Sequence, residues 1–204
     1  MAIDSYANLK QAIERFSHRT DISDLIDDFI DLAENTIDKQ LRLRANESKE
    51  RATAPTSDRF LALPDRFVEM RRLQLINGSV TKDIKFKAPE ALKIADTSGE
   101  PKYFTITSQI EFDRTPSSAY TIEMVFYKGL NPLSSSNTSN NVLTNYPDLY
   151  LYASLYHLNN WTGDDEQMGK YLNLFNAALT SANKQEMRGR FGAAPVIGLE
   201  GWTP

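Results

Sequence analysis

The sequence TIEMVFY, at residues 121–127, has the strongest strand signal in the chain because β-branched and aromatic residues fill it. A second run, MRRLQLI at residues 70–76, ends at Asn77-Gly78, a pair typical of hairpin turns. Shorter runs that alternate or resemble strands lie nearby, at residues 84–87, 103–107 and 110–112. Strands joined by short turns predict an antiparallel sheet, a sandwich or a small barrel.

The segments on both sides of these strands have the apolar spacing of helices. Ser5 can cap a first helix, and a longer helix is expected to begin near Asp21 and to end near Leu41. Helix is expected again from Tyr146, with apolar side chains on nearly every face, and a last helix is expected to run to about Met187. The expected fold class is α+β, a helical bundle made of an N-terminal hairpin and a C-terminal helix pair, with the antiparallel sheet inserted.

The domain boundaries follow from these changes of period. Residues 1–50 and 142–187 are assigned to the bundle, residues 51–141 to the inserted sheet, and residues 188–204 to an extended tail. The polar stretch SSSNTSNN at residues 134–141 is interpreted as a surface loop, with a hinge or contact loop as the alternative. The tail combines glycines with apolar residues, which favours a segment that becomes ordered on a partner; packing on its own domain is the alternative.

Composition restricts the class of function. The chain has 204 residues, 25% of them charged, with a formal net charge of -4 and no cysteine. A negative net charge argues against a dedicated nucleic-acid binder, and the lack of cysteine excludes disulfides and thiolate metal sites. The start of the sequence lacks signal-peptide features, and no apolar run approaches the ~20 residues of a membrane span, so synthesis in a host cytoplasm and no membrane partner are expected.

No catalytic constellation is evident. The two histidines, His18 and His157, are isolated, and neither a nucleophile elbow nor a phosphate-binding glycine motif occurs. The acidic groups at residues 27–28 and 164–166 could be glycosidase carboxylates, but both lie near expected helix starts, where acidic residues favour the helix dipole. The chain is therefore predicted not to be an enzyme and to have no metal and no cofactor.

Several short stretches together resemble a known family. They are YANLK (6–10), RTD (19–21), LALPDRFVEMR (61–71), GEPKYF (99–104), YTIEMVFY (120–127) and NYPDLYLY (145–152). Together with the order of helical and sheet segments, over about residues 3–190, these stretches resemble the head-to-tail adaptor (connector) family of short-tailed bacteriophages. The segment after Arg190 has no counterpart in this resemblance.

The resemblance implies a virion structural protein at the head–tail interface. It implies a ring, typically a dodecamer, that lies beneath the portal, binds the portal protein and a downstream tail or nozzle protein, and lets DNA pass during ejection without specific binding. Portal contact is assigned to the tail, at Arg188, Arg190, Phe191, Val196, Ile197, Leu199 and Trp202. Contact on the tail side is assigned to Arg71, Arg72, Lys82 and Lys85 in the sheet region.

The aromatic helix supplies the expected contact between copies. A closed ring needs two different adhesive faces on each subunit, and the crowded Tyr/Leu helix is a source for one of them. The subunit-interface residues expected there are Tyr150, Tyr152, Tyr156 and His157. Three alternatives stay open: a tail-tube or head-completion ring protein at a neighbouring layer, a cell-wall glycan hydrolase that uses Asp164 or Glu166, and a glycan-binding module suggested by the tyrosines.

Overall fold

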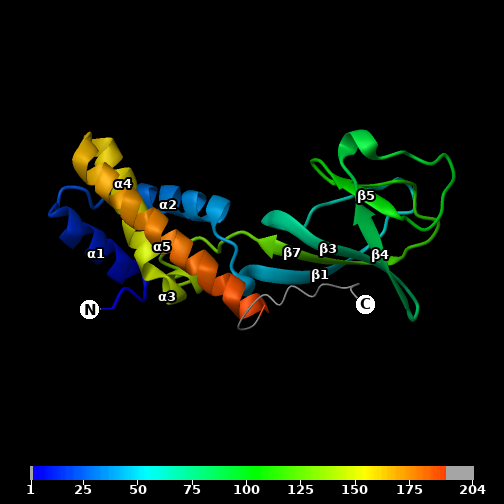
Figure 1. Cartoon of the computed structure of the whole chain (residues 1–204), viewed down its shortest axis with the longest axis horizontal. Coiled ribbons are helices and arrows are strands. Elements are labelled where there is room, and N and C mark those ends of the chain that lie inside the picture. Colours follow the sequence, from blue (N-terminus) through cyan, green and yellow to red (C-terminus); the bar gives the residue numbers. More distant parts are fainter. Residues whose placement is uncertain (1, 192–204) are drawn as a thin grey trace, which may run out of the picture. The chain divides into compact units, whose positions relative to one another are not determined.

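A computed structural model describes the backbone of residues 2–191 and the side chains of residues 2–189 (Figure 1). The described chain divides into two compact units. The helical unit contains the residues up to Ala45 and those from Leu130 onward, and the sheet unit is Asn46–Gly129. Helices and a seven-stranded sheet together confirm the predicted α+β class.

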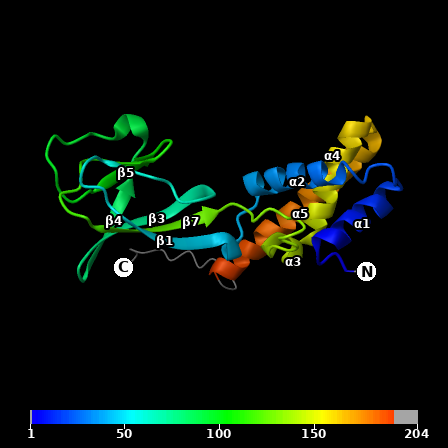
Figure 2. The same cartoon turned by 180° about the vertical axis from the view of Figure 1, so that it is seen from behind.

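The helical unit is organised around one central helix. Its helices are α1 (Tyr6–Ser17), α2 (Ile26–Gln40), α3 (Asn141–Asn145), α4 (Pro147–Thr162) and α5 (Asp165–Phe191). Helix α4 packs against each of the other four, and Figure 2 shows this group from behind. Because α4 has neighbours on several sides, its apolar residues on several faces are buried, including Leu149, Leu151 and Leu155.

Local capping chemistry fixes where these helices begin and end. The Ser5 hydroxyl accepts a 3.4 Å hydrogen bond from the Asn8 N–H at the start of α1. Pro147 occupies the first turn of α4, where its missing N–H costs nothing, and Gly163 ends that helix at φ 73°. His18 ends α1 in the left-handed conformation, at φ 54°, so this histidine has a structural position.

Two predicted helix boundaries, the start of one helix and the end of another, are wrong. Helix α2 begins at Ile26 rather than near Asp21, because the residues before it form turns that nevertheless bury Ile22. Helix α5 continues to Phe191, so the extended tail does not begin at Arg188. The short helix α3 was not predicted.

The sheet unit contains seven strands and one short 3₁₀ turn, and a second 3₁₀ turn spans the boundary from the helical unit. The strands are β1 (Glu47–Thr53), β2 (Phe60–Leu61), β3 (Phe67–Asn77), β4 (Val80–Phe86), β5 (Tyr103–Ile106), β6 (Ile110–Phe112) and β7 (Thr121–Lys128); the turns are η1 (Arg44–Asn46) and η2 (Pro89–Ala91). Their order across the sheet is β1-β7-β3-β4-β5-β6-β2. The predicted turn at Asn77-Gly78 is present between β3 and β4, with Gly78 at φ 59°.

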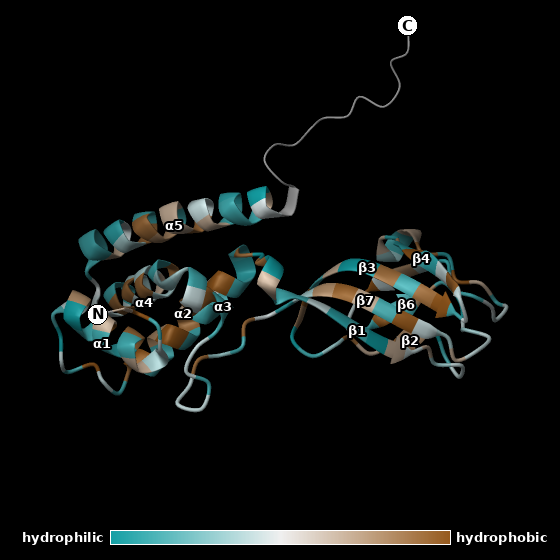
Figure 3. Ribbon diagram, turned by 90° about the horizontal axis from the view of Figure 1, so that it is seen from below, coloured by the Kyte–Doolittle hydropathy of each residue, from teal (hydrophilic) through white to brown (hydrophobic). Residues whose placement is uncertain are grey.

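The pairing of the strands differs from the prediction at one place. All neighbouring strands are antiparallel except β4 and β5, which are parallel through Lys85–Tyr103 and Phe86–Phe104. The η2 turn and the segment that follows it separate β4 from β5, so the two strands are not joined by a hairpin. Figure 3 shows apolar stretches along β3 and β7, whose inward side chains, among them Leu73 and Phe126, form the core of this unit.

The segment after the sheet belongs with the helices. Residues 130–141, assigned from the sequence to the inserted sheet region, pack on the helical unit instead, where Leu130 and Leu133 are buried. The Leu130 N–H donates to both carboxylate oxygens of Asp38, at 2.9 and 3.1 Å, and the Leu133 N–H donates to Glu34 at 2.8 Å. Two carboxylates one turn apart on α2 therefore hold this segment. No helix within residues 2–191 is both long and apolar enough to cross a membrane.

Candidate functional site

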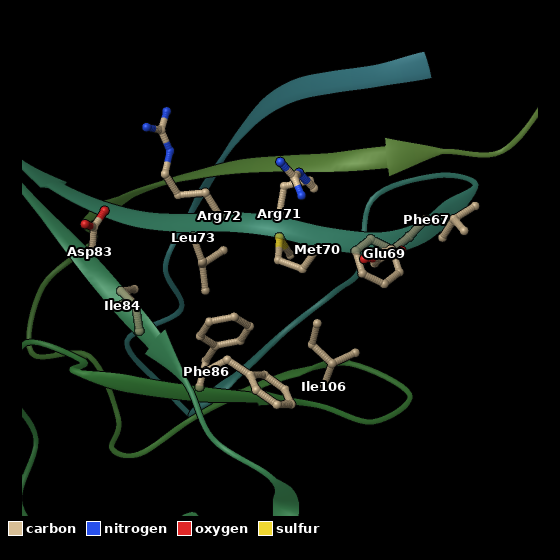
Figure 4. A pocket seen from close by; sticks show the side chains of 12 residues that line it. Phe67, Glu69, Met70, Arg71, Arg72, Leu73, Asp83, Ile84, Phe86 and Ile106 are labelled. Carbon is tan, nitrogen blue, oxygen red and sulfur yellow. The ribbon is translucent and has the colours of Figure 1, made fainter. Parts of the chain in front are cut away.

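A groove of about 490 Å³ lies in the sheet unit beside the first half of β3 (Figure 4). Its apolar lining residues are Phe67, Val68, Met70, Leu73, Ile84, Phe86, Phe104 and Ile106; the polar ones are Glu69, Arg71, Arg72 and Asp83. We call it the β3 groove. Phe86 is 61% exposed although it lies among other apolar side chains. The volume of the β3 groove is within the roughly 300–1,000 Å³ range of protein ligand sites.

The β3 groove exists because β4 leaves β3. Strand β4 pairs with β3 only opposite Leu73–Asn77 and then pairs with β5 at Lys85 and Phe86. Ahead of Leu73, β3 pairs with β7 alone among the described strands. The space between the diverging strands is open and mainly apolar.

A β-bulge in β3 places two consecutive side chains on the same side of the strand. The register with β7 shifts between Met70 and Arg72, so Arg71 is the extra residue of the bulge. As a result Arg71 and Arg72 are both exposed and point away from Met70 and Leu73, as Figure 4 shows. The guanidinium of Arg71 lies 5.7 Å from the centre of the Tyr127 ring. The β3 edge thus has two exposed arginines on its outer side and an apolar inner side, with Glu69 and Asp83 as the acidic residues of the groove lining.

The helical unit has an exposed surface that lacks charge. Between Lys170 and Lys184, helix α5 contains no charged residue. It is buried along a narrow stripe only, and its exposed residues in this stretch are Leu172, Asn173, Leu174, Asn176, Ala177, Thr180 and Ser181. We call these seven residues the neutral α5 face. Helix α2 differs, since its exposed side carries Asp27, Asp28 and Asp31.

A comparison with protein-family models identifies the lineage. The model described as SU10 adaptor protein matches residues 4–197, nearly the whole chain. The chain belongs to the SU10 adaptor protein family. This is a phage head-to-tail adaptor family, so the predicted relationship is confirmed. A search of curated proteins finds no match.

Membership in the SU10 adaptor family makes the chain a phage structural protein of the virion neck, and such adaptors are generally non-enzymatic. The carboxylates considered as glycosidase acids have structural contacts. Asp164 accepts the Gln167 N–H at 3.0 Å and caps α5, and Asp27 forms a 2.7 Å ion pair with Lys10. Within residues 2–191 no cluster of three or more histidine, cysteine or acidic side chains has the geometry to hold a metal ion.

The predicted interface tyrosines of this adaptor do not all reach the surface. Tyr150 is completely buried in the helical core, so its side chain cannot contact another subunit, and its assignment is wrong. Tyr152, Tyr156 and His157 are half-buried. The Nε2 atom of His157 lies 3.0 Å from the Thr36 hydroxyl, and burial lowers the pKa of this imidazole.

The predicted tail-side residues lie at two places on the sheet unit of the adaptor. Arg71 and Arg72 border the β3 groove, whereas Lys82 and Lys85 line a separate cavity of about 250 Å³. Lys82 forms an ion pair with Glu100. The structure therefore brings these four basic residues onto one unit without joining them into one patch.

The portal-contact residues predicted for the tail fall mostly outside the described part of the chain. Arg188 lies on the exposed side of α5. The backbone of Arg190 and Phe191 is the end of that helix, but their side chains are outside the described part of the chain. The other predicted contact residues lie wholly outside it: Val196, Ile197, Leu199 and Trp202.

Sequence reasoning missed both the β3 groove and the neutral α5 face. The neutral face has a signal in the sequence, namely the absence of charge from residue 171 to residue 183 in a chain that is 25% charged. The groove has no such local signal, because it depends on where β4 exchanges one partner strand for another.

Proposed function

We propose that this adaptor assembles into a ring, typically of twelve copies, beneath the phage portal, where it forms a conduit for DNA and a platform for the tail. The neutral α5 face is the observation that carries the proposal. The buried centres of protein interfaces are depleted in charged residues, and an exposed helix surface without charge is suited to burial against a neighbour. Here the face includes Leu172 and Leu174, each 36% exposed.

A ring also needs a second, different face on each copy. Apolar side chains are exposed elsewhere on the helical unit, on α1, α2 and α4: Phe16 at 49%, Leu32 at 46% and Trp161 at 56%. We assign the neutral α5 face to one side of the contact and the surface around Leu32 and Trp161 to the other. Tyr152, Tyr156 and His157 stay proposed members of the subunit interface.

The charge of the chain supports the role of a conduit. With a net charge of -4 on each copy, a ring of copies surrounds the channel with negative potential. Like charge repels the phosphates, so DNA slides through without being gripped. On the sheet unit, Arg71, Arg72, Lys82 and Lys85 are proposed to face the tail component, and residues 188–204 are proposed to reach the portal.

Mixing the purified chain with its cognate portal and imaging the product by electron microscopy tests the ring. We expect rings on the portal for the wild type. Leu174→Glu places a charge on the neutral α5 face and is expected to abolish rings, whereas Gln11→Glu, on the exposed side of α1, is expected to leave them intact. Circular dichroism checks that both variants fold. Wild-type protein that forms no ring on a folded portal contradicts the proposed function, and normal rings of Leu174→Glu contradict the assigned interface.

Truncation before Gly192 tests the portal contact separately. This boundary leaves α5 whole, because the helix ends at Phe191. The truncated chain also keeps the 2.8 Å hydrogen bond that Arg44 donates to the Gly189 carbonyl within the helical unit. We expect the truncated chain to fold and to bind the portal more weakly. Undiminished binding rejects the assignment of residues 192–204 to the portal and leaves the ring proposal standing.

A further inference from the structure

The first half of β3 is a strand edge with one neighbour. From Phe67 to Arg72 its partner among the described strands is β7, and on the other side lies the β3 groove. A strand edge that faces an open groove is a template for a further strand, which gains main-chain hydrogen bonds along the edge. The edge and the groove therefore provide the two parts of a peptide-binding site, a main-chain template and side-chain pockets.

The two sides of the edge differ in chemistry, and this specifies the ligand. Residues of an added strand that point inward meet Met70, Phe86 and Ile106 in the groove. Residues that point outward lie beside Arg71 and Arg72, which are exposed on the opposite side. Since strand residues alternate between faces, the matching strand has apolar residues at every second position and acidic residues between them.

We propose that the β3 groove binds an extended strand of a different virion protein, the downstream tail component, by adding it to the edge of β3. This inference rests on the proposed function, because it assumes that the chain lies in the neck. In place of a tail-side contact spread over Arg71, Arg72, Lys82 and Lys85, the proposal gives one defined site, at which the bound strand forms main-chain hydrogen bonds with β3.

The chain's own C-terminal segment does not match this ligand. From Gly192 to Pro204 every third residue is glycine or proline: Gly192, Pro195, Gly198, Gly201 and Pro204. Proline lacks the N–H that a strand ladder needs, and glycine weakens a strand. Alternation of apolar and acidic residues is absent from this segment.

A second copy does not match it either. The outermost strands of the sheet are β1 and β2. Strand β1 has the sequence ESKERAT, in which Ala52 is the single apolar residue, and β2 has two residues. Strand β1 offers no apolar face to the groove, and β2, although both of its residues are apolar, is too short to pair along residues 67–72.

Site-specific photocrosslinking tests the occupant in complete particles. The full chain carries p-benzoylphenylalanine in place of Phe86, at the groove, or in place of Ile94, which is 42% exposed and does not line the groove. After irradiation, mass spectrometry identifies the linked residues. We expect the Phe86 probe to link to an alternating apolar and acidic segment of another virion protein, and the Ile94 probe not to link to that segment.

The other outcomes are distinct. Linkage of the Phe86 probe to residues 192–204 or to the sheet of a second copy overturns the proposal, as does the absence of linkage in particles that contain the chain. Absence of the chain from purified particles contradicts the proposed function instead, and immunoblotting of the same particles detects it.

Hydrogen exchange tests the main-chain pairing. Amides of residues 67–72 are expected to exchange at least ~10-fold more slowly in particles than in the free chain. Residues 121–128 are the internal control, because β7 already has β1 and β3 on its two sides. Equal exchange of residues 67–72 in both samples overturns strand addition.

A charge reversal tests the outer side of the edge. Arg72→Glu is expected to reduce retention of the tail component on neck complexes by at least ~10-fold. Lys93→Glu reverses a charge at an exposed residue of the sheet unit that lines neither cavity, and it is expected to leave retention within about twofold. Equal losses for both variants point to general charge attraction and overturn the defined site.

Discussion

The hydroxyl of Tyr150 on α4 donates a 3.0 Å hydrogen bond to the Oε1 atom of Glu34 on α2. Both side chains are buried, at 0% and 7% exposure. The Leu133 N–H donates to the same carboxylate oxygen, and the Asn140 side-chain amide donates to the Tyr150 hydroxyl at 2.6 Å. This network joins two helices to the segment that enters the helical unit from the sheet.

Tyr150→Phe removes the centre of this network. It leaves a buried carboxyl with one partner fewer and the Asn140 amide without this acceptor, so we expect the free energy of unfolding to fall by about 1–3 kcal/mol. Chemical denaturation followed by circular dichroism measures the change. Tyr152→Phe is the control, since Tyr152 is half-buried and its ring stacks on Tyr171. Equal losses in both variants contradict a special role for the Tyr150 hydroxyl.

Glu34 makes the stability of the helical unit depend on pH. Burial raises the pKa of this carboxyl from 4.5 to about 7, against the lowering effect of the Leu133 N–H and the Tyr150 hydroxyl, while Asp31 and Asp38 raise it further. A raised folded-state pKa gives stability that is complete below the unfolded value and is lost as pH rises through the folded value. We therefore expect stability to decline between about pH 4.5 and 7, by at most roughly 3 kcal/mol.

Glu34→Gln isolates this contribution. The amide keeps an oxygen that accepts from Leu133 and Tyr150 but does not titrate, so its unfolding free energy is expected to be flatter across this pH window. Denaturation curves at several pH values measure the slope for both proteins. Parallel slopes contradict the assignment of the pH dependence to Glu34.

Two glycines in α5 are expected to respond oppositely to alanine. A Cβ at Gly169 meets no atom within 4 Å, so Gly169→Ala is expected to stabilise the helix by about 1 kcal/mol. A Cβ at Gly189 would overlap the Arg44 guanidinium, so Gly189→Ala is expected to displace that side chain. This variant should therefore be stabilised less than Gly169→Ala, or destabilised. Thermal unfolding compares them, and equal gains contradict the close approach.

Much of the fold follows from local chemistry. The caps at Ser5, Pro147 and Gly163, the turn at Gly78 and the strand of residues 121–127 are determined by neighbours in sequence, and the structure has all of them. Such signals depend on propensity and on the φ angles that a residue tolerates, so they are visible without tertiary information.

The features that the sequence did not predict depend on distant contacts. Residues 130–141 belong to the helical unit because Glu34 and Asp38 bind main-chain N–H groups roughly a hundred positions away. The charged strand β1 is stable where it is because Lys49 and Arg51 both pair with Glu123 of β7, each at 2.8 Å. The expected helix from Tyr146, with apolar side chains on nearly every face, is present as α4, but which of its tyrosines faces inward depends on packing, and Tyr150 does.

Glu186 is expected to give the opposite pH dependence from Glu34. Burial alone would raise its pKa, but hydrogen bonds from the Arg44 main-chain N–H, the Tyr146 hydroxyl at 2.9 Å and the Arg44 side chain outweigh burial, and the pKa lies below its ordinary value of 4.5. A lowered folded-state pKa gives stability that is present above the unfolded value and is lost as pH falls.

Glu186→Gln removes the charge and is expected to cost about 1–2 kcal/mol at pH 7. Because the wild-type carboxyl itself becomes protonated in acid, the gap between the two proteins should narrow as pH falls below 4.5. Glu166→Gln, in the exposed first turn of the same helix, is the control and should cost only a few tenths of a kcal/mol. Urea unfolding at pH 7 and in acid measures both differences. A Glu186→Gln deficit that stays constant with pH would mean that the Arg44 and Tyr146 contacts do not depend on the charge of the carboxylate.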